Sequence, residues 1–180
     1  IDGKYRNKAT NGSNPQFYRF DKPEDDRFPK MIELFCRSNF KLKNAEGITP
    51  VHIDDEVSSL SAILLNDDYY QVLLNGKEMR NGLSVLRPEY IILFKAKAYL
   101  DLKKRKELGE KVDSSDVKKH KKDVLCIASE LMLQKVETLP IAIDADIHSF
   151  IDLLDQEPFD QNSLKRYGLE NEDVVEVLKK

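Results

Sequence analysis

Features that mark several common protein classes are missing from this chain of 180 residues. Its two cysteines, Cys36 and Cys126, lie in separate apolar runs without a CxxC partner, so neither a zinc site nor a disulfide scaffold is expected. No apolar run approaches the roughly twenty residues of a membrane span, and no signal-peptide pattern occurs. We therefore expect a cytoplasmic protein with buried free thiols and no membrane association.

The short motifs that identify familiar enzymes are missing as well. No GxGxxG, P-loop, HExxH or GxSxG pattern occurs, which excludes the enzyme classes that a single motif identifies. His52 and His148 are interpreted as surface or packing residues rather than metal ligands.

What the chain does contain is ordinary for a soluble globular protein, with 41% hydrophobic and 34% charged residues. The length suits one sizeable core, so we expect one domain. The formal net charge of −3 hides a basic middle and an acid-rich C-terminal part. The basic residues of the middle are Lys103, Lys104, Arg105, Lys106, Lys111, Lys118, Lys119, Lys121 and Lys122.

The first part of the chain predicts β structure. Residues 4–6 and 17–20 are expected to form a hairpin around the turn-rich residues 11–15. Residues 31–36 form a nearly continuous apolar run and predict a buried strand with Glu33 on one face.

The next part mixes strands with a short helix. Residues 48–65 predict two strands, although the second also suits a helix. Residues 66–68 are typical of a helix cap, and Gly76 is expected to end that helix. Asn81-Gly82 predicts the turn of a second hairpin.

From Pro88 onward the pattern is helical. We therefore expect an α+β fold, with a β-rich part over residues 1–87 and a helical part over residues 88–180 packed on it. The predicted helices span 88–108, ended by Gly109, 114–133, capped by Asp113 or Ser114, 140–155, 161–167 and 171–179.

A charged stripe lies on the second of these helices. Asp116, His120 and Asp123 are spaced i, i+4 and i+7, and Lys119 neighbours both carboxylates. The stripe suits the orientation of a phosphate or of a catalytic carboxylate. It equally suits a solvated face on which Asp116 meets the positive helix terminus.

The two basic runs, 103–106 and 118–122, suit either a nucleic-acid backbone or a solvated face. Only Tyr99 is near them in sequence, so aromatic residues are not interleaved for base stacking. Lys95 and Lys97 lie roughly 200 degrees apart on an apolar helix, so at least one is expected to meet a partner. If the Glu33 carboxylate is buried, it needs a cation such as Lys95 or a metal as its partner. If Glu33 lies on an edge strand with its carboxylate in water, it needs neither.

Three stretches of the chain carry a resemblance to a known family: residues 56–70, 94–102 and 113–124. They resemble the later part of bacterial nucleotidyltransferase-like proteins. These proteins are similar to the toxin components of abortive-infection (type IV) toxin–antitoxin systems, within the DNA polymerase beta-type superfamily. The resemblance covers roughly residues 1 to 135.

The resemblance implies a nucleotidyltransferase-like mixed β-sheet followed by an α-helical C-terminal part. It also implies transfer of a nucleoside monophosphate from an NTP to RNA, protein or a small acceptor, with Mg²⁺ bound, and an antitoxin as partner. By the same resemblance, Glu33 matches a metal-binding catalytic carboxylate, Lys95 the phosphate-binding lysine and Asp123 a late catalytic carboxylate. Lys119 is a weaker match for a phosphate contact.

The chain departs from this family at one decisive point. The family's DxD pair after a glycine turn is missing upstream of Glu33, where Asp2 is the one acid beside a glycine. The start at Ile1 suggests a processed, tagged or truncated chain, and a degenerate relative is the other explanation. We expect the chain as it stands to be inactive. The alternative function is a catalytically silent module whose basic helices bind nucleic acid or an acidic protein.

Overall fold

A computed structural model of the chain describes residues 3–9, 15–33, 66–136 and 138–179. The chain divides into two compact units, Ile1–Asp55 and Glu56–Lys180, which are described separately below. Of the predicted elements, the strands over 48–65 and the end of the strand over 31–36 lie outside the described residues. The predicted division into a β-rich part, 1–87, and a helical part, 88–180, packed on it stays a prediction.

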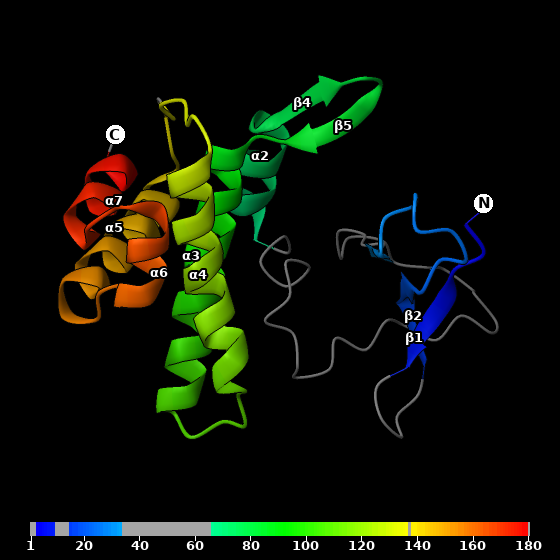
Figure 1. Ribbon diagram of the computed structural model, residues 1–180, viewed down its shortest axis with the longest axis horizontal. Coiled ribbons are helices and arrows are strands. Elements are labelled where there is room, and N and C mark those ends of the chain that lie inside the picture. Colours follow the sequence, from blue (N-terminus) through cyan, green and yellow to red (C-terminus); the bar gives the residue numbers. More distant parts are fainter. Residues whose placement is uncertain (1–2, 10–14, 34–65, 137, 180) are drawn as a thin grey trace. The chain divides into compact units, whose positions relative to one another are not determined.

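The first unit contains a three-stranded antiparallel sheet in the order β1-β2-β3 (Figure 1). Its strands are β1 (Arg6–Ala9), β2 (Pro15–Asp21) and β3 (Met31–Glu33). The predicted hairpin is confirmed, but its first arm begins at Arg6 rather than at Lys4. Lys4 has a φ of 43°, a left-handed conformation that cannot continue a strand.

The first described element of the second unit is α2 (Asp67–Asn75), which is capped as the sequence predicts. The side chain of Asn66 accepts hydrogen bonds from the backbone N–H groups of Asp68 and Tyr69. Gly76 follows the helix, and a Cβ placed there would lie 2.3 Å from the ring of Tyr90, so only glycine fits this approach.

A two-stranded antiparallel hairpin, β4 (Lys77–Arg80) and β5 (Leu83–Leu86), then projects from the helices (Figure 1). Its turn residues Asn81 and Gly82 have φ values of 51° and 78°. Positive φ at both central residues defines the turn that asparagine followed by glycine favours, and the predicted hairpin is confirmed.

Five helices complete the unit (Figure 1). Pro88 opens the first of them, and Asp113 caps the second by accepting the N–H of Ser115. The second helix ends at Glu130 rather than 133, because Leu131 adopts an extended backbone. The helices are α3 (Pro88–Glu107), α4 (Ser114–Glu130), α5 (Ile141–Gln156), α6 (Gln161–Tyr167) and α7 (Asn171–Leu178).

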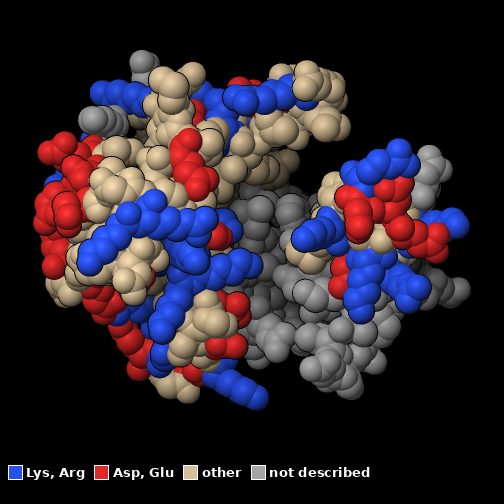
Figure 2. All heavy atoms as spheres, in the orientation of Figure 1, with Lys and Arg blue, Asp and Glu red and all other residues tan. Residues whose placement is uncertain are grey.

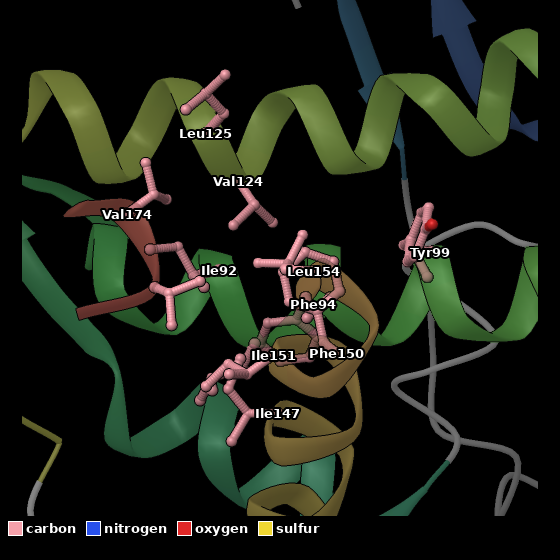
Figure 3. Close-up of a cluster of buried hydrophobic side chains, with 14 of the residues drawn as sticks. Ile92, Phe94, Tyr99, Val124, Leu125, Ile147, Phe150, Ile151, Leu154 and Val174 are labelled. Atoms are coloured by element: carbon pink, nitrogen blue, oxygen red, sulfur yellow. The ribbon is translucent and has the colours of Figure 1, made fainter. Parts of the chain in front are cut away.

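The core of this unit lies where α3, α4 and α5 meet, with α6 and α7 closing it (Figure 3). Phe150 of α5 is fully buried, and its ring meets that of Tyr99 edge-on with 5.5 Å between centroids. α3 packs against α2, α4 and α5, so apolar side chains are buried around most of its circumference. A cation on a packed side of α3, such as Lys95 or Lys97, therefore lies close to other elements of the protein.

The described part of the chain is mixed α/β and mostly helical, with two small antiparallel sheets. The predicted α+β class is confirmed at this level. A mixed sheet of the nucleotidyltransferase kind stays a prediction. Among the described helices, none combines the length and the apolar character that crossing a membrane requires.

Candidate functional site

Lys95 and Asp123, two of the predicted site residues, lie together on the facing surfaces of α3 and α4. Lys95 Nζ donates to Asp123 Oδ2 at 2.6 Å, and the two side chains are 29% and 33% exposed. The structure thus brings a predicted phosphate-binding lysine beside a predicted carboxylate. The pair also satisfies itself, because each charge already has its partner.

The other two predicted site residues are not part of this pair. The backbone of Glu33 pairs with Arg19 in the sheet of the first unit, and its side chain lies outside the described residues. The partners suggested for it, Lys95 or a metal, therefore stay predictions. Lys119 is exposed on α4, and its contact with a phosphate also stays a prediction.

Lys97, on the other side of α3, is held by two carboxylates. Its Nζ lies 3.2 Å from Asp146 on α5 and 3.4 Å from Asp101 on its own helix. Burial lowers the pKa of Lys97, but Asp101 and Asp146 together outweigh this effect and raise it. The buried Tyr69 of α2 donates its hydroxyl to the same Asp146 at 2.9 Å. Lys95 and Lys97 therefore both have partners, where the sequence required a partner for at least one of them.

A third polar group joins α3 and α4 to the end of α5. Tyr99 donates to the carboxylate of Glu157 at 3.0 Å, and Lys103 does so at 2.7 Å. Lys121 donates to the backbone carbonyls of Glu157 and Pro158 and lies above the Tyr99 ring. Burial lowers the pKa of Lys121. This member of the basic run therefore caps α5 and does not belong to the free surface.

The stripe of Asp116, His120 and Asp123 differs in exposure along its length. Asp116 is exposed, whereas His120 is half-buried and its Nδ1 is buried without a hydrogen-bond partner in the described part of the chain. Burial, and next the neighbouring Lys95, lower the pKa of His120, while Asp123 acts in the opposite direction. The stripe and Lys95 form one charged cluster between α3 and α4.

This cluster does not provide a set of magnesium ligands. Magnesium prefers several oxygen ligands, and the carboxylate of Asp123 already accepts from Lys95. Within the residues that the structure describes, no three His, Cys, Asp or Glu side chains come together as a metal site. Magnesium binding stays an expectation of the family resemblance.

A second candidate site is a surface of exposed cations on α4 and α6, which we call the α4–α6 basic surface. Within the described part of the chain, none of its five cations makes an ion pair with a carboxylate. Figure 2 shows Lys and Arg atoms gathered over these two helices. The members of the surface are Lys118, Lys119, Lys122, Lys165 and Arg166.

A small hollow of about 140 Å³ lies between the two helices of this surface. Its α6 side was not predicted from the sequence, which gave for residues 88–180 only helices packed on the β-rich part. A signal was present: Asn162 with Arg166, and Ser163 with Tyr167, are spaced i, i+4 and share one side of a helix. The lining residues are Lys122, Leu125, Asn162, Ser163, Arg166 and Tyr167.

Comparison with known proteins does not identify the chain. No protein-family model, no curated protein and no solved structure gives a match. The resemblance to nucleotidyltransferases stays a prediction. The chemistry of the described residues is therefore the basis for any proposal about function.

Proposed function

We propose that this protein binds the phosphate backbone of a nucleic acid through the α4–α6 basic surface. One observation supports this proposal above all: five exposed cations on two adjacent helices have no carboxylate partner in the described part of the chain. By contrast, Lys95, Lys97 and Lys103 of α3 all form ion pairs.

Nucleic acid suits this surface better than an acidic protein does. A stable protein interface needs a desolvated centre, usually with apolar or aromatic anchors. Among the described residues, α4 and α6 carry none of the large exposed apolar side chains, although Leu131 and Met132 directly follow the end of α4. Phosphate contacts need little beyond clustered cations, because binding is driven by the release of counterions.

The test is a titration of a fluorescein-labelled single strand of about twelve nucleotides, followed by anisotropy at several salt concentrations. The test variant is Lys118→Gln/Lys122→Gln/Arg166→Gln. The control variant, Lys77→Gln/Lys135→Gln/Lys179→Gln, removes three charges from exposed positions elsewhere. Glutamine keeps good helix propensity on α4 and α6.

For the wild-type chain, the logarithm of the affinity should fall with the logarithm of salt with a slope of about −3. The test variant should lower the affinity at least about tenfold at low salt and flatten the slope by about 2, since it removes three phosphate contacts. The control variant should retain most of the wild-type affinity and most of the wild-type salt slope. Equal affinities of the two variants would show that the α4–α6 basic surface is not the binding site.

Nucleotidyl transfer remains the other hypothesis, and the contact between Lys95 and Asp123 is the observation that favours it. Calorimetric titration of magnesium–ATP into the wild-type chain and into Lys95→Ala tests the assignment of Lys95. If Lys95 contacts the phosphates, the variant should lose most of the binding heat. Equal heats would exclude Lys95 as the phosphate contact.

A further inference from the structure

The hollow between α4 and α6 combines an apolar floor with a charged rim. Leu125, which is buried, and the partly buried ring of Tyr167 supply apolar surface. Lys122 from α4 and Arg166 from α6 line the same hollow and belong to the α4–α6 basic surface. An aromatic ring beside cations is the arrangement on which proteins stack the bases of single strands.

The polar groups of the hollow retain hydrogen-bonding capacity. The side chain of Asn162 makes no hydrogen bond within the described part of the chain, so its amide keeps two donors and an acceptor. The Ser163 hydroxyl donates to Asp160 at 2.9 Å, which leaves its own oxygen free to accept. An amide and a hydroxyl at the edge of a ring-sized space suit the edge of a nucleobase.

The Tyr167 ring is fixed from two sides. It packs against the hydrophobic core, and the neighbouring thiol of Cys126 raises the pKa of Tyr167 to about 12. The guanidinium of Arg166 lies 5.9 Å from the centre of the same ring. A ring that is already positioned loses little conformational freedom when a base stacks on it.

We propose that this hollow takes one unpaired base of a single-stranded nucleic acid, with neighbouring phosphates on Lys122 and Arg166. This inference rests on the proposed function, because the same two cations belong to the backbone-binding surface. A base inside a duplex is stacked between its neighbours and cannot offer its face to Tyr167. A duplex can therefore use only the cations of the surface, whereas a single strand can use both the cations and the hollow.

The test compares a single strand of about twelve nucleotides with an abasic strand of the same length and charge. The wild-type chain should bind the strand with bases about tenfold more tightly than the abasic strand, because stacking strengthens binding by about 1–3 kcal/mol per base. This comparison changes the probe and not the protein, so it does not depend on the folding of a variant. Equal affinities of the wild-type chain for the two strands would overturn the inference.

Two variants assign the effect to Tyr167. Tyr167→Leu should lose about tenfold in affinity for the strand with bases and keep its affinity for the abasic strand, whereas Tyr167→Phe should retain the preference. A Tyr167→Leu variant with the wild-type preference would also overturn the inference. If the strands bind equally but Lys118→Gln/Lys122→Gln/Arg166→Gln weakens both, only the base site is wrong. If the wild-type chain binds neither strand, the proposed function is wrong as well.

Discussion

α3 and α4 are adjacent, lysine-rich helices, yet their cations are used differently. Lys95, Lys97 and Lys103 of α3 each contact a carboxylate on another element. On α4, Lys118 and Lys122 are exposed and unpaired in the described part of the chain. The number of lysines in a segment therefore does not identify a binding surface. A cluster of exposed lysines without internal partners is the better indicator.

The cause of the difference is the burial of the two helices. α3 packs against α2, α4 and α5, so a charge on it is partly removed from water and needs a partner. α4 packs against α3, α6 and α7 and leaves one side to solvent, where a lysine is stabilised mainly by water. A lysine is thus structural on a packed side, as Lys95 of α3 and Lys121 of α4 are, and available for a ligand on a solvent-facing side.

The largest effect on this comparison is expected from Asp146→Ala. The change removes the acceptor of the buried Tyr69 hydroxyl and one of the two acids that hold Lys97. A buried donor left without an acceptor destabilises a protein by about 1–3 kcal/mol, and we expect about 2 kcal/mol here. Urea unfolding followed by circular dichroism measures the loss.

The matched control is Asp152→Ala, which removes an exposed acid from the same helix. It should change the free energy of unfolding by less than about 0.5 kcal/mol. A loss as large as that of Asp146→Ala would mean that helix α5 responds to any lost acid. The special role of the Asp146 network would then be contradicted.

A smaller effect is expected from the pair of Lys95 and Asp123, because both side chains are about one-third exposed. A double-mutant cycle with Lys95→Ala and Asp123→Ala should give a coupling free energy of about 0.5–1 kcal/mol in urea unfolding. High salt should reduce it. A coupling near zero would show that the pair does not stabilise the contact of α3 with α4.

The unpaired cations of α4 and α6 should behave in the opposite way. Lys118→Gln/Lys122→Gln/Arg166→Gln is expected to change the free energy of unfolding by less than about 0.5 kcal/mol, since no ion pair is lost. Because Lys118 and Lys122 are spaced i, i+4 and repel each other, their removal favours a slight gain in the free energy of unfolding. Lys97→Gln, the matched change on α3, should lose about 1 kcal/mol. Equal losses would remove the contrast between the helices.

Local chemistry made much of this fold predictable from the sequence. Asn66, Pro88 and Asp113 mark helix starts because a cap acts within its own turn, and Asn81-Gly82 marks a hairpin through its own backbone. The predicted end of α4 was less accurate, at residue 133 instead of Glu130. Leu131 and its apolar neighbours continue the helical pattern in sequence, although the backbone leaves the helix there.

The candidate site was less predictable, because its contacts join distant parts of the chain. The sequence singled out Lys95 and Asp123 but could not show that they neutralise each other across two helices. It also grouped Lys121 with Lys118 and Lys122, although Lys121 turns to the carbonyls at the end of α5. The hollow with Tyr167 requires the packing of α6 on α4, which periodicity does not determine.

The smallest effect is expected from pH, through His120 in the charged cluster between α3 and α4. Burial lowers the pKa of His120 below its ordinary value of 6.5, and the positive charges of Lys95 and Lys119 lower it further. The carboxylates of Asp123 and Asp116 raise it, but by less. The folded state then binds fewer protons than the unfolded state, so stability rises with pH. The stabilising contribution is complete above the ordinary pKa and is lost as pH falls through the lower folded-state pKa.

Urea unfolding between about pH 5 and pH 8 measures this effect, which is small because the ring is only half-buried. His120→Gln should lose less stability than the wild-type chain as the pH falls through that range. His148→Gln, which changes an exposed histidine on α5, should keep the wild-type dependence. If both variants follow the wild-type curve, the pKa of His120 is the same in the folded state as in the unfolded chain. The charged cluster would then be open to water, and α3 would resemble α4 more than their ion pairs indicate.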